Sequence, residues 1–178
     1  MWAKQKESGF TIVELLIVIV VIGILAAITI VSFNGVQDKA RGAKVTSDIA
    51  QIKKAVAAAE ATTGKTLNGI TNSYSTGVSC WTKAAGTDLS SLNKTGDQCW
   101  IDYVKALTAI SNAGGVNITA LVDPWNRPYL IDENEGEGGN CTRDTIAVFP
   151  LPITGGFGVY DKYSKVNDVP ISGNSTCS

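Results

Sequence analysis

The chain has 178 residues, with 15 Lys and Arg side chains against 16 Asp and Glu side chains, so its formal net charge is −1. A nearly balanced charge gives no basis for strong, general nucleic-acid binding. The sequence contains no His, which excludes imidazole metal ligands and every Ser-His or Cys-His catalytic arrangement. The composition therefore favours a structural protein over an enzyme, and the length suits one globular domain with an additional segment.

The N-terminal part of the chain changes abruptly from polar to apolar. Residues 1–9, MWAKQKESG, are polar and include Lys4 and Lys6. The chain is apolar from Phe10, and the run 12–31 covers 20 residues. A helix of that length is about 30 Å long, the thickness of a bilayer's hydrocarbon core. Because the basic residues precede the run, we expect the N-terminus on the cytoplasmic side and the remainder outside.

One acidic residue, Glu14, interrupts the apolar run near its start. A charge deep in a membrane helix costs about 2.5–3.5 kcal/mol on insertion scales, so such a residue is a candidate for function. The alternative is an interfacial position, where the headgroups keep the carboxylate hydrated.

Three interpretations of this segment compete. A cleaved secretory signal peptide has a shorter apolar core followed by an A-x-A-like site, whereas this run is long and carries a carboxylate. A plain signal anchor explains the length of the run but leaves Glu14 unexplained. The third interpretation is cleavage between Gly9 and Phe10 by a peptidase on the cytoplasmic side, which leaves the apolar helix as the mature N-terminus.

Residues 9–16, GFTIVELL, resemble the cleavage site of type IV prepilins and type II secretion pseudopilins, and the match continues through 23–28, GILAAI. The resemblance implies a leader at 1–9, cleavage after Gly9 by prepilin peptidase and N-methylation of the new terminal Phe10. It also implies storage in the inner membrane, the pilus assembly machinery as a partner, and a helical homo-oligomeric filament outside the cell.

The same resemblance implies a role for Glu14 in filament assembly. In the family, this carboxylate pairs with the N-terminal amine of a neighbouring subunit. A buried charge without its partner costs about 3–5 kcal/mol, so the pair sets the axial register. One departure stands at Val31, where many family members have Pro; without it, unwinding of the helix at that point is in doubt. Gly23 remains a weak position, by about 1 kcal/mol relative to Ala.

A helical period persists beyond the apolar run. Apolar residues recur three or four positions apart, as on one face of an amphipathic helix: Val45, Ile49, Ile52, Val56 and Ala59. We therefore predict one helix from Phe10 to about Thr63, with Gly64 as its C-cap. Its filament-core half, 10–33, is expected to protrude, and its amphipathic half, 34–63, is expected to pack against a globular head, 64–178.

The head is predicted to be small and of mixed structure. Residues 65–98 read as a long loop or a few short elements, and 99–112 show helical spacing. Strand patterns follow at 129–131, 145–149 and 158–160. These elements predict an α+β arrangement in which a small antiparallel sheet rests on the long helix, and the resemblance implies the type IV pilin fold.

Four cysteines, Cys80, Cys99, Cys141 and Cys177, lie beyond the apolar segment. An even number in an exported domain predicts two disulfides, and no CxxC spacing indicates zinc. Three pairings are open; we favour Cys80–Cys99 and Cys141–Cys177, because each closes a local loop. Trp81, beside Cys80, is expected to be a local packing anchor.

Two further segments of the head stand out. Residues 123–129, DPWNRPY, resemble the D-P-W-x-x-P-Y segment of major pseudopilins and some Gram-positive-type pilins. We interpret them as structural, because two prolines frame a turn over two aromatic rings.

Residues 132–139, DENEGEGG, offer oxygen ligands that could hold calcium, and the resemblance also implies calcium binding near this point. Their spacing does not fit an EF-hand, so we expect a solvated loop, no metal site and no cofactor.

The sequence thus predicts a structural pilin subunit of a type IV pilus, serving adhesion, twitching motility or DNA uptake. The alternative is a major pseudopilin of a type II secretion system. A membrane-anchored enzyme is disfavoured, because His, metal-ligand spacing and a nucleophile elbow are all lacking from the sequence. DNA or a host surface could be a partner, but the sequence does not locate a basic patch for either.

Overall fold

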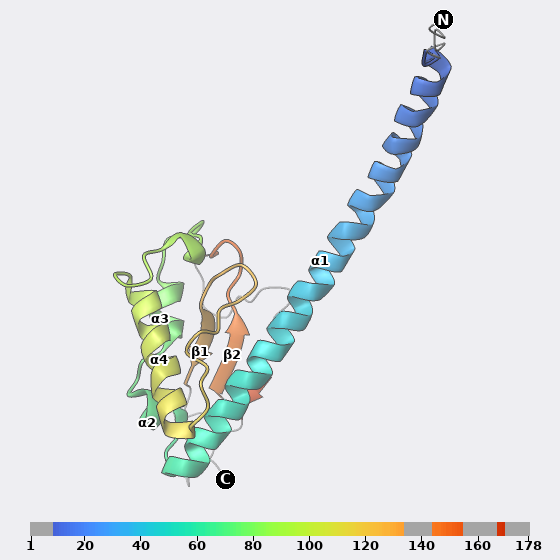
Figure 1. Cartoon of the computed structure of the whole chain (residues 1–178). Helices are drawn as coiled ribbons and strands as arrows, with labels where there is room; N and C mark the ends of the chain where they lie inside the picture. Colours follow the sequence, from blue (N-terminus) through green and yellow to red (C-terminus); the bar gives the residue numbers. More distant parts are fainter. Residues whose placement is uncertain (1–8, 134–143, 155–166, 170–178) are drawn as a thin grey trace, which may run out of the picture. The chain divides into compact units, whose positions relative to one another are not determined.

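The computed structural model describes residues 9–133 and 144–154 and the backbone of 167–169. The chain divides into two compact units, Met1–Ala40 and Arg41–Ser178. One helix, α1 (Ile12–Thr63), contributes to both units (Figure 1). It ends at the predicted residue and begins two residues later than predicted.

The first unit contains the apolar part of α1. The stretch Ile12–Thr29 is long and apolar enough to cross a membrane, and none of it is buried within the chain. Its large side chains are instead exposed, for example Ile12 at 84% and Leu25 at 58%. Because a soluble environment would leave this surface in contact with water, it needs lipid or other protein chains to cover it.

In the second unit, α1 presents the predicted apolar stripe to the core of the head. All five predicted stripe residues are at most 1% exposed: Val45, Ile49, Ile52, Val56 and Ala59. The helix ends at Gly64, which has a φ of +65° and donates its N–H to the carbonyl of Glu60 at 2.8 Å. A positive φ suits Gly because it has no Cβ, so the predicted C-cap is confirmed.

Four short elements follow before the sheet: α2 (Leu67–Thr71), α3 (Thr76–Trp81), the 3-10 helix η1 (Leu89–Ser91) and α4 (Gln98–Gly114). Polar side chains cap the N-termini of these elements, as N-caps do in general. The region 65–98 therefore holds the few short elements that were one of its two predicted forms. The predicted helix at 99–112 is confirmed, although it extends to Gly114 and is capped by Gly115 with a φ of +66°.

The sheet has the order β1–β2–β3, and both pairings are antiparallel. Its strands are β1 (Tyr129–Asp132), β2 (Asp144–Val148) and β3 (Asn167–Val169). The first two confirm the predictions at 129–131 and 145–149. The strand predicted at 158–160 lies outside the described residues, and β3 was not predicted, because NDV is polar and too short to show alternation.

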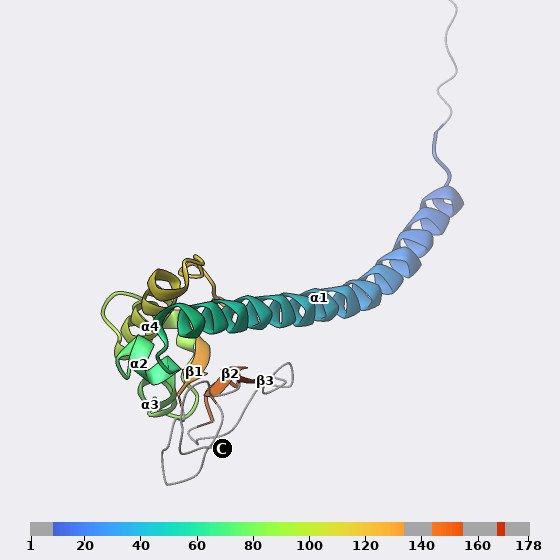
Figure 2. The same cartoon turned by 90° about the horizontal axis from the view of Figure 1, so that it is seen from below.

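Both faces of β1 and β2 are buried, which is why the apolar residues of these two strands do not alternate with exposed polar ones. Tyr129, Ile131, Ile146 and Val148 belong to the apolar cluster built by α1 and α4. Leu130 and Ala147 belong to a second cluster that includes Trp81 of α3 and the two cysteines Cys80 and Cys99. Figure 2 shows α1 and α4 on one side of the strands. The α+β pilin arrangement predicted from the sequence is therefore the fold of the head.

The approach of α4 to α1 depends on a residue without a side chain. A Cβ added to Gly114 would lie 2.7 Å from the carbonyl oxygen of Ala55 and 3.0 Å from the backbone nitrogen of Ala59. Backbone atoms cannot move aside as a flexible side chain can, so the two helices would have to separate. The small residues of α1 at this crossing have the same effect of permitting close contact.

We predict that Gly114→Ala lowers the free energy of unfolding by about 1–3 kcal/mol, the usual cost of overpacking a core. Denaturant unfolding of the detergent-solubilised full chain measures this change. Gly69→Ala in α2 is the matched control, because its added Cβ meets only the Lys65 and Thr66 side chains, at 3.4 Å or more. Equal stability of both variants would show that the helix crossing tolerates a Cβ.

Candidate functional site

The candidate assembly site lies at the start of α1. Gly9 and Phe10 precede the helix and are exposed, and the Phe10 side chain is 84% exposed. Residues 1–8 lie outside the described residues. Cleavage after Gly9 and methylation of Phe10 therefore stay predictions, although both residues are placed where a peptidase could reach them.

Glu14 forms a reciprocal set of hydrogen bonds with Thr11. The Thr11 backbone N–H donates to Glu14 Oε2 at 2.8 Å, and the Thr11 hydroxyl donates to the same oxygen at 2.7 Å. The Glu14 backbone N–H lies 3.3 Å from Thr11 Oγ1. This is the geometry of a capping box, which satisfies donors that the first turn of a helix leaves unpaired.

The capping box gives Glu14 a partner within its own chain before any neighbour is present. A carboxylate next to an apolar surface is costly unless polar groups accompany it, and Thr11 supplies two such donors. We had singled out Glu14 but not Thr11. The spacing T-x-x-E immediately before an apolar run is the sequence signal that could have identified Thr11.

A second set of polar groups fastens α1 to the head. Asp48 is 5% exposed and lies among the stripe residues of α1. Its Oδ2 accepts a hydrogen bond from the Tyr129 hydroxyl at 2.7 Å and forms an ion pair with Lys44. Lys44 Nζ also donates to the carbonyl of Val122 at 2.7 Å. An acid on an apolar stripe was not predicted, and its burial is permitted because both charged and neutral donors reach it.

The segment 123–129 closes around a buried ion pair. Arg127 Nε lies 2.7 Å from Asp123 Oδ2, and the two side chains are 1% and 0% exposed. Asp123 Oδ1 also accepts the backbone N–H groups of Trp125 and Arg127 at 2.9 and 2.8 Å. Arg127 Nη1 donates to the carbonyl of Pro150 at 3.0 Å. The segment therefore joins the start of β1 to the end of β2, in agreement with its structural interpretation, although Arg127 had not been singled out.

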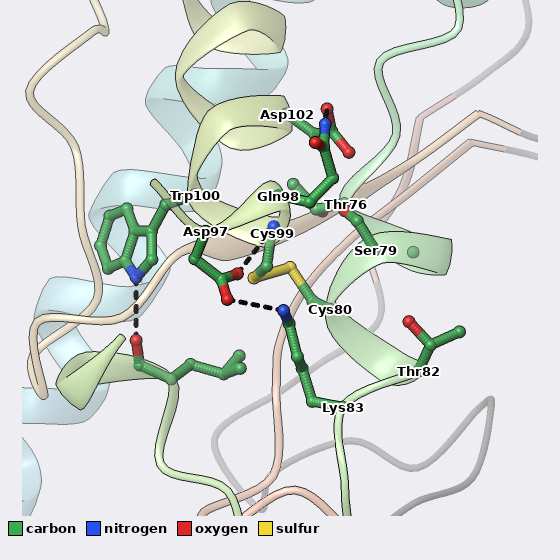
Figure 3. The surroundings of a disulfide bond; sticks show 12 residues. Thr76, Ser79, Cys80, Thr82, Lys83, Asp97, Gln98, Cys99, Trp100 and Asp102 are labelled. Carbon is green, nitrogen blue, oxygen red and sulfur yellow. Dashed lines mark hydrogen bonds and ion pairs between the residues drawn. A yellow bond between two sulfur atoms is a disulfide. The ribbon is translucent and has the colours of Figure 1, made fainter. Parts of the chain in front are cut away.

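Cys80 and Cys99 form a disulfide, as the loop-closure argument predicted, with their Cα atoms 4.7 Å apart (Figure 3). Both residues are fully buried. Nearby, Lys83 Nζ and Asp97 Oδ2 form an ion pair at 2.7 Å, and Asp97 also caps α4. The bond therefore ties α3 to the first turn of α4. Cys141 and Cys177 lie outside the described residues, so their pairing stays a prediction.

The acidic segment is described only at Asp132 and Glu133. Glu133 is 4% exposed; its Oε1 accepts a hydrogen bond from the Thr71 hydroxyl at 2.8 Å, while its Oε2 is buried without a hydrogen-bond partner. Burial raises the pKa of Glu133 above its ordinary value, and the nearby Asp132 carboxylate adds to the effect. Across the described residues, no three acidic, Cys or His side chains gather as metal ligands, so calcium binding rests on the sequence argument alone.

The fold and the start of α1 together define a class: a chain with an α+β head and an exposed apolar helix that is long enough to cross a membrane and carries one acid at its capped N-terminus. The family model for the prokaryotic N-terminal methylation motif matches residues 4–30. This match covers the leader boundary and most of the apolar run.

Named pilins and a pseudopilin match parts of the chain. The chain is 42% identical to type II secretion system core protein G of Klebsiella michiganensis over 53 residues, 30% of this chain and 37% of the relative. It is 34% identical to the type IV major alpha-pilin of Moraxella bovis over 103 residues, 52% of this chain and 62% of the relative. It is 44% identical to the type IV narrow pilus major component PilA5 of Thermus thermophilus over 55 residues, 31% and 47% of the two chains. No solved structure matches the chain.

The motif and these relatives show that part of the chain is similar to type IV pilins and type II secretion pseudopilins. Its relatives are structural subunits and not enzymes. The matches span less than two thirds of each of these relatives, and they include both pilins and a pseudopilin. These matches thus support a relationship to pilins and pseudopilins, but they do not decide between a pilus subunit and a secretion pseudopilin.

We predict that Glu133→Gln stabilises the head at neutral pH and has little effect near pH 4. In acid, both the folded and the unfolded chain hold the proton on Glu133. The Glu and Gln side chains are then both neutral, and the two proteins should have similar stability. As the pH rises, the unfolded chain loses its proton first, because the folded pKa is raised, and the wild type loses stability. Relief of a buried unsatisfied group is worth about 1–3 kcal/mol.

Thermal unfolding of the full chain from pH 4 to pH 8 tests this prediction. A constant difference between wild type and Glu133→Gln across that range would contradict it. Isothermal titration of both proteins with calcium, up to millimolar concentration, tests the calcium expectation in the same samples. Calcium-dependent stabilisation of the wild type that Glu133→Gln removes would show a cation, not a proton, at this carboxylate.

Proposed function

We propose that the chain is a structural pilin subunit that polymerises into a type IV pilus after its leader is removed between Gly9 and Phe10. The observation that carries the proposal is the uncovered apolar surface of Ile12–Thr29, which lies within the matched methylation motif at residues 4–30. The cytoplasmic membrane covers this surface in the stored precursor, and the same surface of neighbouring copies covers it in the extracellular filament.

Apolar burial supplies the driving force in both locations. Burying apolar surface is worth about 25 cal/mol per Å² relative to water, so the exposed helix strongly disfavours release of a free subunit into solution. Transfer from lipid to a bundle of helices exchanges one apolar environment for another. Specificity in that exchange therefore depends on the few polar groups that the helix carries.

Glu14 and the new N-terminal amine of Phe10 are the groups that can provide this specificity. Thr11 holds the Glu14 carboxylate at the first turn of α1, four residues from Phe10, which would carry the new amine of the same chain. A neighbour that brings its own amine to Glu14 satisfies both charges, and any other axial offset leaves them uncompensated. Prepilin peptidase and the assembly machinery are the partners that this route requires.

The alternative is a major pseudopilin that assembles a short filament for type II secretion. The similarity to type II secretion system core protein G and the segment 123–129 favour it. Immunogold electron microscopy of the native host separates the two: long surface filaments that carry the chain support a pilus, and their absence in secreting cells supports a pseudopilus. Adhesion, twitching motility and DNA uptake are tested only after that result.

We predict that the mature protein begins at a methylated Phe10. Mass spectrometry of the N-terminal peptide, from membranes and from sheared filaments, measures this directly. Deletion of the host's prepilin peptidase is the control, and it should restore the full leader. An intact Met1 in assembled filaments would remove the proposed processing route.

We predict that Glu14→Ala leaves cleavage largely intact and reduces filament yield strongly, because loss of one partner of a buried charge pair costs about 3–5 kcal/mol. Filament yield is measured by shearing and immunoblotting, with membrane-held subunit as the reference. Thr29→Val is the matched control within the apolar segment, because the Thr29 hydroxyl bonds only to carbonyls of its own helix. Normal yield from Glu14→Ala would exclude a register role.

A further inference from the structure

The outer edge of the sheet is formed by β1, since the strand order is β1–β2–β3. An edge strand offers a row of unpaired N–H and C=O groups, which can pair with a strand from another chain. In β1 these residues are apolar and buried; Tyr129, Leu130 and Ile131 are all 0% exposed. Such an edge would be prone to pairing with another chain if it were open, because Tyr129–Ile131 suit strand pairing and Asp132 is the single acidic residue of the strand.

The start of α3 occupies this edge. Thr76 Oγ1 accepts a hydrogen bond from the backbone N–H of Ile131 at 2.6 Å. The same hydroxyl lies 3.1 Å from the carbonyl oxygens of Tyr129 and Ile131, to either of which it can donate its proton. The Thr76 hydroxyl thus supplies Tyr129 and Ile131 with hydrogen-bond partners that a neighbouring strand would otherwise supply.

Ser75 reinforces the contact. Its hydroxyl accepts the backbone N–H of Gly77 at 3.1 Å, as the N-cap of α3, and lies 3.1 Å from the Ile131 carbonyl oxygen. The approach is close: a Cβ added to Gly77 would lie 2.6 Å from Asp132 Oδ1. A side chain at this position would have to displace the Asp132 carboxylate, to which the Ser75 hydroxyl also donates at 3.3 Å, so α3 and β1 are in close contact here.

Two contacts hold α3 in this position. At its C-terminal end, the Trp81 ring packs edge-on against Phe149, with ring centroids 5.7 Å apart. Between Trp81 and the edge contacts lies Cys80, which is bonded to Cys99 of α4. Figure 3 shows Thr76 and Cys80 on the same short helix, beside the first turn of α4.

We infer that the segment 75–81 is an edge cap, which the Cys80–Cys99 disulfide fastens over β1 and which prevents copies of the chain from pairing through their β1 edges. This inference does not rest on the proposed pilus, because two folded copies of the chain could pair through their sheet edges whether or not they form a filament.

The test compares Thr76→Val with Thr76→Ser in the full chain in detergent micelles. Val has the shape of Thr but no hydroxyl, so the Ile131 amide loses its acceptor; Ser keeps the hydroxyl. Thr108→Val is the matched control, because the exposed Thr108 hydroxyl donates only to Val104 of its own helix, at 2.7 Å. Amide exchange at Ile131 and the infrared band of intermolecular strands are the two readouts.

We expect Thr76→Val to lose about tenfold in Ile131 amide protection, the effect of one hydrogen bond, and to form strand-paired oligomers. Thr76→Ser and Thr108→Val should keep the Ile131 amide protection of the wild type and should form no strand-paired oligomers. A Thr76→Val protein that remains monomeric, or that associates without intermolecular strands, would overturn the inference.

If Thr76→Val does not fold, the double variant Cys80→Ala and Cys99→Ala provides the second measurement, because it removes this disulfide and leaves Cys141 and Cys177 unchanged. Loss of Ile131 protection and strand-paired association in the double variant support the cap. Unchanged protection at Ile131 would show that the disulfide does not fasten the cap, and would equally overturn the inference.

Discussion

The structure depends first on an apolar surface that the chain does not cover itself. The side chains of Ile12–Thr29 are exposed along the whole stretch, and water is the one environment in which this is strongly unfavourable. The head, in contrast, buries its own stripe of α1 completely. One helix therefore serves two purposes: its second half completes a domain, and its first half requires a lipid bilayer or other subunits.

Polar groups give each half its specificity. In the apolar half, Glu14 is accompanied by Thr11, so the acid is part of a helix cap as well as a candidate for contact between subunits. In the head, Asp48 is engaged by the Tyr129 hydroxyl and Lys44, and Asp123 by the Arg127 side chain and two backbone N–H groups. A misplaced helix or turn would leave these acids buried without partners, which is far more costly than a poor apolar contact.

Much of this arrangement could be predicted from the sequence, because periodicity and turn chemistry are local. The stripe on α1, the C-cap at Gly64, the helix before Gly115 and the first two strands each carry their own pattern. What could not be predicted depends on contacts between distant segments. Asp48 meets Tyr129 across 81 positions of sequence, and Thr76 meets Ile131 across 55; no local pattern indicates either pair. The third strand was not predicted for a different reason: it has three residues, two of them polar, which are too few to show a period.

The candidate site shows the same division. Glu14 was identified because a charge in an apolar run is conspicuous, and Cys80–Cys99 because the two residues are near in sequence. Arg127 was not singled out within the segment 123–129, although it is fully buried. Its guanidinium reaches Asp123 with Nε and Pro150 with Nη1, in two different directions. A planar group with several fixed donors can do this, whereas the single ammonium of lysine cannot. A relative with the D-P-W segment and an arginine at this position could connect the start of its first strand to the end of its second strand through one side chain. The identity of that residue therefore indicates whether a relative can form the same contacts.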